Sequence, residues 1–144
     1  MKVTLNQLIA KLQTIANNHE QINSFFFGDI ADLGTESPMQ YPVLFADVAP
    51  SNFSYKVIAL NFQLMVMDIV KKDLSNENDV MSDTLQMIED VIIELRNPSE
   101  VFLIQDSITL IPFMDSQGDE VAGWTANITL NVPSTYNSCA VPSN

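Results

Sequence analysis

The sequence predicts an α+β fold in which two helices pack on one face of an antiparallel sheet of four to five strands. Apolar residues recur at helical spacing near the N-terminus and again near residues 81–95, whereas the segments between and after them alternate or run apolar as strands do. The resulting order is α-β-β-β-α-β-β, and layering both helices on one side of a single sheet buries it most economically. With 144 residues of which 47% are hydrophobic, we expect one domain over residues 1–133 and an extended C-terminal arm over 134–144.

The first helix is predicted over residues 5–18. Thr4 followed three residues later by Gln7 forms a capping-box pattern. Apolar residues then recur on one face, namely Leu5, Leu8, Ile9, Leu12, Ile15 and Ala16. The opposite face is polar, so we expect this helix to cover a core on one side and to meet water on the other.

Three strands are predicted next. The aromatic run Phe25, Phe26 and Phe27 ends at Gly28 and is followed by a loop to residue 42, which is rich in glycine and proline. "PVLFADV" is the second strand, Pro50-Ser51-Asn52 is expected to turn, and residues 55–70 form the third strand. The third strand is apolar on both faces, which predicts burial on both, one in the core and one against a neighbouring subunit.

The second helix and a terminal hairpin complete the fold. The helix is predicted over residues 79–96, with Met81, Leu85, Ile88, Ile92 and Leu95 along one side. Two extended runs, joined by "DSQGDE", are typical of a hairpin. We expect the core to contain Trp124, Ile128 and Leu130 of the last strand and Leu85, Ile88 and Ile92 of the helix.

The sequence contains little catalytic equipment. His19 beside Glu20 is one acid–base candidate, but a histidine after a helix more often interacts with the helix dipole. A pairing of Cys139 with His19 is a second, equally weak candidate. Asp115, Asp119 and Glu120 lack the spacing of a calcium loop, and the four glycines form no phosphate-binding pattern. We therefore expect no enzyme, no metal and no cofactor.

The charge balance restricts the partners. Eighteen acidic residues against six basic ones give a net charge of -12, which repels phosphate backbones and anionic lipids. Sequence-specific nucleic-acid binding is disfavoured, although an acidic wall suits a channel through which DNA only slides. No stretch has the length of a membrane span or the apolar run of a signal peptide, so we expect a cytoplasmic protein with no membrane partner.

The order of elements, closing in "DEVAGWTANITLNV", resembles the tail-terminator and head-to-tail connector (neck ring) proteins of tailed bacteriophages. The resemblance covers about residues 4–133. The low glycine count, the Asn-rich polar face and "SYKVIALNFQLMVMDIV" also look like products of crAss-like phages, which infect gut hosts of the Bacteroides type.

The resemblance implies a structural virion protein that is assembled in the host cytoplasm. It would form a ring of six or twelve copies between the portal or connector and the tail ring proteins, with DNA passing through as non-specific cargo. The expected contacts between copies are Phe25, Phe26, Phe27, Met39, Tyr41, Met65, Met67 and Tyr136. Two other classes stay open: a small acidic adaptor or immunity-type protein that masks a basic partner, and an enzyme that uses His19.

Overall fold

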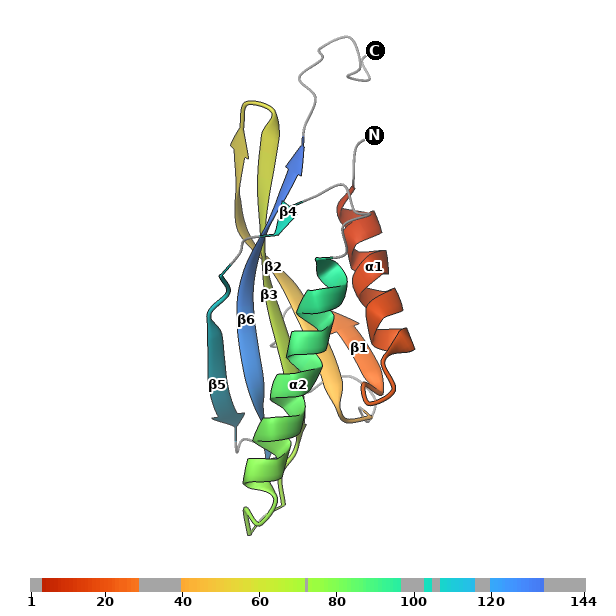
Figure 1. Cartoon of the computed structure of the whole chain (residues 1–144), viewed down its shortest axis with the longest axis vertical. Helices are drawn as coiled ribbons and strands as arrows, with labels where there is room; N and C mark the ends of the chain where they lie inside the picture. Colours follow the sequence, from red (N-terminus) through yellow and green to blue (C-terminus); the bar gives the residue numbers. More distant parts are fainter. Residues whose placement is uncertain are drawn as a thin grey trace.

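The computed structural model describes residues 4–28, 40–71, 73–96, 103–104, 107–115 and 120–133. Over these residues the fold is α+β, as the sequence predicts, with both helices on one side of the sheet (Figure 1). The elements in chain order are α1 (Leu5–Asn18), β1 (Ser24–Phe27), β2 (Val43–Ser54), β3 (Val57–Ile69), α2 (Glu77–Leu95), β4 (Leu103–Ile104), β5 (Leu110–Asp115) and β6 (Val121–Pro133). The predicted C-terminal arm lies outside the described residues.

The sheet is mixed, which corrects the expectation of a purely antiparallel one. Its order is β1-β2-β3-β6, and β4 and β5 both pair with the outer edge of β6, at different points along it. Only β1 and β2 run parallel. Parallel neighbours need a connection of about a dozen residues or more, and the chain from Gly28 to Pro42 has that length.

The run after residue 100 was predicted as one strand, but it is divided between β4 and β5. Leu103 and Ile104 pair with Asn131 and Leu130, whereas residues 110–115 pair with Val121–Ala126. The predicted hairpin with β6 is present, since Asp115 lies opposite Val121. Pro112 has no backbone N–H to donate, and such a residue fits an edge strand, which β5 is.

Helix α1 begins as the sequence predicts. The Thr4 hydroxyl accepts from the Gln7 backbone N–H at 3.2 Å, and the Thr4 N–H donates to Gln7 Oε1 at 2.8 Å. This reciprocal pair satisfies two backbone donors at the N-terminus. The helix buries Leu8, Leu12, Ile15 and Ala16 against the sheet and α2.

Helix α2 is rotated slightly from the prediction. Its buried residues are Val80, Thr84, Met87, Ile88, Val91, Ile92 and Leu95, while Met81 and Leu85 are half-buried at the margin of this stripe. Thr84 is polar, so apolar spacing alone does not place it on the buried side. Its hydroxyl donates to the Val80 carbonyl at 2.6 Å, and this hydrogen bond allows its complete burial.

The main core lies between the helices and the sheet. Ile128, Leu130, Ile88 and Ile92 are buried in it, and Trp124 and Leu85 are half-buried against it. The Trp124 indole N–H donates to the Met81 carbonyl at 2.9 Å, which joins β6 to the first half of α2. The tryptophan is therefore a polar link between layers as well as a packing residue.

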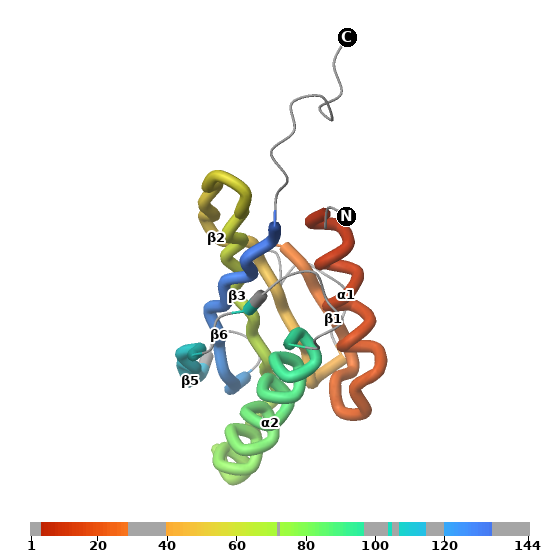
Figure 2. Tube along the Cα trace, turned by 45° about the horizontal axis from the view of Figure 1, so that its top comes forward, coloured from red at the N-terminus to blue at the C-terminus, as the bar shows by residue number. Residues whose placement is uncertain are grey.

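Strand β2 continues through the segment predicted to turn. The pairing of β2 with β3 shifts between Ala49 and Asn52, which marks a β-bulge, and the chain reverses at Tyr55 and Lys56 instead. A bulge accommodates Pro50 because the ladder there loses a backbone donor. The hairpin is consequently longer than expected, and it extends past the end of the helix layer (Figures 1 and 2).

Gly123, which precedes the tryptophan, lies where two backbones meet. A Cβ at this position would overlap the Val66 carbonyl oxygen and would lie 2.8 Å from the Val66 carbonyl carbon and 2.9 Å from Met67 Cα. These atoms belong to the backbone of β3 and cannot rotate away. In the "GW" pair of the sequence, Gly123 is therefore required by the close β3 backbone, and Trp124 links β6 to α2.

We expect Gly123→Ala to destabilise the fold by about 3 kcal/mol or more, at or above the upper end of overpacking costs, because the β3 backbone must shift. Thermal unfolding with circular dichroism measures the effect. Asn127→Ala is the matched control, since Asn127 is exposed on the same strand. Equal melting temperatures for the two variants would contradict the close approach at Gly123.

Candidate functional site

The end of the β2–β3 hairpin is the most exposed apolar part of the described structure. We call residues 50–57 the hairpin arm, and every one of them is exposed. Phe53 is 72% exposed and Tyr55 69%, far above the other large apolar side chains that are exposed among the described residues. A contiguous exposed patch that contains aromatic side chains is typical of an interaction surface.

The hairpin arm carries one positive charge at its turn. Lys56 adopts φ of 70° and places its Nζ 5.2 Å from the centre of the Tyr55 ring. A cation at this distance over an aromatic face is attracted by the ring quadrupole. The tip therefore presents a lysine and two aromatic rings within four consecutive residues.

Backbone pairing holds the hairpin arm in place. Ser54 pairs with Val57, and Val57 pairs on its other side with Pro133 of β6. At the bulge, the Asn61 side-chain amide donates to the Pro50 carbonyl at 2.7 Å, and the Asn61 backbone N–H donates to Ser51 Oγ at 3.0 Å. The exposed rings are thus carried on a supported extension of the sheet.

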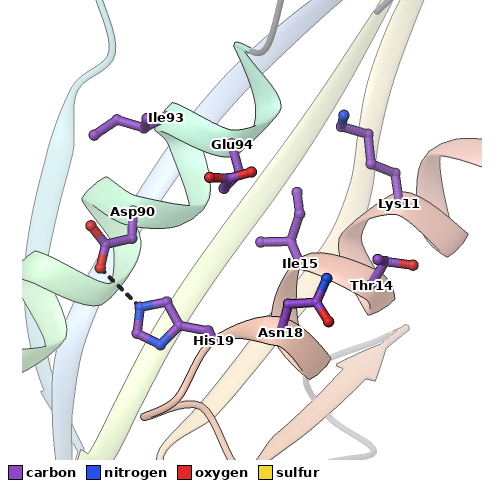
Figure 3. A pocket seen from close by; sticks show the side chains of 8 residues that line it. All are labelled: Lys11, Thr14, Ile15, Asn18, His19, Asp90, Ile93 and Glu94. Carbon is purple, nitrogen blue, oxygen red and sulfur yellow. Dashed lines mark hydrogen bonds and ion pairs between the residues drawn. The ribbon is translucent and has the colours of Figure 1, made fainter.

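A second feature is a groove of about 540 Å³ between α1 and α2 (Figure 3). We call it the helix groove. Its size lies within the range of ligand pockets, roughly 300–1,000 Å³. The lining residues are Lys11, Thr14, Ile15, Asn18 and His19 of α1 and its C-cap, and Asp90, Ile93 and Glu94 of α2.

His19 and Asp90 form a hydrogen bond across the groove, with His19 Nε2 and Asp90 Oδ2 2.9 Å apart. His19 Nδ1 accepts the backbone N–H of Gln21 at 3.1 Å. This arrangement leaves the ring proton on Nε2, where it is donated to Asp90. Because both ring nitrogens are engaged, the histidine ties the end of α1 to α2.

The groove has one hydroxyl and no thiol among its lining residues. The Thr14 hydroxyl donates to the Ala10 carbonyl at 2.9 Å, so it is occupied by its own helix. Glu20, the neighbour considered with His19 from the sequence, is exposed, and the carboxylate that reaches His19 belongs to Asp90 instead. Cys139 lies outside the described residues.

The residues expected to contact other copies are distributed over two faces of the sheet. Phe25 and Phe27 pack against the main core. Phe26 stacks on Phe45 at 6.0 Å and, with Tyr41, packs on the opposite-face cluster, which consists of Val43, Phe45, Met65, Met67 and Val121. Met39 and Tyr136 lie outside the described residues.

Met65 and Met67 are only 8% and 5% exposed within the single chain. β3 is buried on both faces only from Leu64 to Met67, since Val57 and Ile69 at its ends are exposed. Where the second face is buried, it is buried without a second copy. Among the predicted contact residues, these two methionines therefore offer little surface to a partner in this conformation. The two most exposed large apolar side chains lie on the hairpin arm and the next, Ile93, on the rim of the helix groove. Less exposed ones lie elsewhere, namely Leu5, Ile69, Leu74, Ile111 and Met114.

Two carboxyl groups have shifted pKa values. Burial raises the pKa of Asp68 on β3, and the nearby Asp83 carboxylate adds to this effect against the lowering by the Ile69 N–H. The Ser75 N–H and hydroxyl lower the pKa of Asp73 in the connection before α2. Neither carboxyl lies in the helix groove or on the hairpin arm.

Other classes of site gain no support over the described ranges. No three His, Cys, Asp or Glu side chains within them are grouped to hold a metal ion, and no helix there has the length and apolarity to span a membrane. A scan of protein-family models finds no match, and a search of curated proteins finds no relative.

Sequence reasoning missed the two features that dominate this surface. The hairpin arm is not predicted because Pro50-Ser51-Asn52 has the composition of a turn, although the alternation of Phe53 and Tyr55 with polar Asn52, Ser54 and Lys56 is a strand signal. The partnership of His19 with Asp90 spans 71 positions of the chain, and no local pattern indicates it.

We expect Asp68→Asn to raise the melting temperature at neutral pH. The folded pKa of Asp68 lies above its unfolded value, so the native state binds more protons and stability falls as pH rises through that window. Asparagine has no charge to desolvate. The gain should shrink as the pH approaches the ordinary value of 3.8, which melting curves at several pH values will measure.

Asp73→Asn is the control of opposite sign, because the pKa of Asp73 is lowered and its charged form is favoured in the fold. This change should give no gain at neutral pH. A pH-independent gain from Asp68→Asn would contradict a desolvated carboxyl.

The link between His19 and Asp90 should be visible as a coupling. We expect His19→Ala and Asp90→Ala each to cost about 1–2 kcal/mol, because the bond involves a carboxylate that is partly open to solvent. The double variant should cost less than the sum of the two. Urea unfolding of the four proteins measures the coupling, and strict additivity would mean that the bond contributes nothing.

Proposed function

We propose that this protein is a structural virion protein that forms a ring at the head-to-tail junction of a tailed bacteriophage, as a tail terminator or connector. The observation that carries the proposal is the hairpin arm, a supported extension of the sheet that exposes Phe53 and Tyr55. Monomeric soluble proteins rarely expose large contiguous apolar patches to water. Aromatic rings are enriched at protein interfaces, where their burial contributes a large share of the binding energy.

The position of the hairpin arm favours contact between different surfaces of neighbouring copies. It extends from one end of the sheet, past the helix layer (Figure 1). A projecting element of this kind meets a different patch on its neighbour, and repeated contacts of that type close into a ring when the rotation permits. Copy numbers of six or twelve follow from the resemblance to neck ring proteins.

The net charge of the chain is compatible with a ring through which DNA passes. A net charge of -12 repels the phosphates of DNA, so a channel lined by this protein lets DNA slide without adhering. Where β3 pairs with β6 at Asn61 and Thr129, the side chains are polar and uncharged, and Asn61 Oδ1 accepts the Thr129 hydroxyl at 2.6 Å. In the proposed ring, the portal or connector lies on one side and the tail ring proteins on the other.

The oligomeric state tests the ring. We expect light scattering after gel filtration to give a mass several times 16.0 kDa, at least at high concentration, and Phe53→Ser/Tyr55→Ser to lower it to that of a monomer. Ile111→Ser is the matched control, because Ile111 is exposed on β5 away from the hairpin arm. All variants should retain the melting temperature of the wild type.

If the wild-type protein stays monomeric and forms a one-to-one complex with a basic protein, the result contradicts the ring and favours the acidic adaptor. The location is tested separately, with gold-labelled antibody against the chain on virions of the phage that encodes it. Label at the neck is expected, and label confined to the capsid or the tail tip would contradict the location.

A further inference from the structure

The tip of the hairpin arm is positively charged in a strongly acidic chain. Lys56 is the only basic residue between Val43 and Val70, and it lies at the turn beside Tyr55. Two copies of a chain with a net charge of -12 repel each other, so any contact between them requires local compensation. Lys56 supplies a positive charge at the point that projects furthest.

The helix groove has the complementary composition. Ile93 is 55% exposed at the rim and supplies the apolar surface that an aromatic ring would meet, whereas Ile15 below it is only 9% exposed. Two carboxylates, Asp90 and Glu94, lie on the α2 side and one cation, Lys11, on the α1 side (Figure 3). The groove therefore carries an excess of negative charge beside the apolar side chain of Ile93.

The hairpin arm and the helix groove cannot meet within one chain. The arm continues the sheet past the end of the helix layer, whereas the groove is lined by residues of the two helices. Both views show the end of the β2–β3 hairpin apart from α1 and α2 (Figures 1 and 2). Pairing of Val57 with both Ser54 and Pro133 prevents the arm from folding back. Any contact between these two surfaces must join different copies.

We propose that the hairpin arm of one copy docks in the helix groove of the next copy, with Phe53 or Tyr55 against Ile93 and with Lys56 beside Glu94 and Asp90. This contact rests on the proposed ring and specifies how its copies join. It is heterologous, because each copy offers its arm to one neighbour and its groove to the other. An aromatic side chain that is desolvated in a pocket, with surrounding contacts that exclude water, is typical of an interaction hot spot.

Two variants with different defects test the direction of the contact. The arm variant is Phe53→Ser/Tyr55→Ser, and the groove variant is Ile93→Ser/Glu94→Gln. These four side chains are exposed, so both variants should fold, which melting curves will verify. Each alone should associate at least about 30-fold more weakly than the wild type, the ratio expected for loss of a hot-spot side chain.

Mixing the two variants should give heterodimers. The groove variant still has an intact arm, and the arm variant still has an intact groove, so one productive contact forms and the assembly stops at two copies. Light scattering measures this, by comparing the mass of the mixture with the mass of each variant alone. Self-association of the arm variant at wild-type strength, or a mixture that stays monomeric, would overturn the docking.

A disulfide test reports proximity directly. In a Cys139→Ser background, one copy carries Tyr55→Cys and the other Ile93→Cys, and oxidation of the mixture should give predominantly the mixed dimer. Leu74→Cys replaces Ile93→Cys in the control, because Leu74 is comparably exposed before α2. Equal yields from both pairs would overturn the docking.

The outcomes separate this contact from the ring itself. A wild type that associates while the mixture and the disulfide pair fail leaves the ring in place and removes this contact. A wild type that is monomeric at all concentrations removes both.

Discussion

The pairing of β3 with β6 is the constraint on which the other elements depend. The two strands run antiparallel in unbroken register from Val57 opposite Pro133 to Ile69 opposite Val121. Gly123 is required within this ladder because the β3 backbone occupies the space of a side chain. The β2 strand adds to one side and β4 and β5 to the other, and both helices pack on the face that the ladder's alternating residues make apolar.

The same ladder explains why the described residues have buried apolar clusters on both faces of the sheet. Alternation sends Leu64 and Val66 toward the helices and Met65 and Met67 to the other side, where they are buried with Val43, Phe45 and Val121. Since that second cluster is closed within one chain, the apolar surplus of the molecule lies elsewhere. Its three most exposed members, Phe53, Tyr55 and Ile93, lie on the hairpin arm and on the groove rim, which is where we place the contacts between copies.

The proposed mode of action is mechanical and needs no reacting groups. The arm is supported by the extended pairing of β2, β3 and β6, and the groove is held by the link from His19 to Asp90, so both surfaces are preorganised. Preorganisation reduces the entropy lost on association, which matters for a contact repeated around a ring. The acidic excess that hinders association elsewhere on the surface restricts it to the places where Lys56 and the carboxylates compensate.

The sequence by itself determined the fold class, the order of the elements and the capping box at Thr4 and Gln7, because these depend on local spacing and alternation. It predicted two-sided burial for all of β3, which the structure shows only from Leu64 to Met67. It did not determine that β1 runs parallel to β2, that Pro50 lies in a bulge or that Thr84 is buried, because each depends on a partner strand or on a helix's own carbonyls. The helix groove could not be predicted from the sequence either, because His19 and Asp90 come together only when α1 and α2 pack. Tertiary structure therefore decided which apolar residues are hidden and which face outward, and with that the surface on which function is proposed.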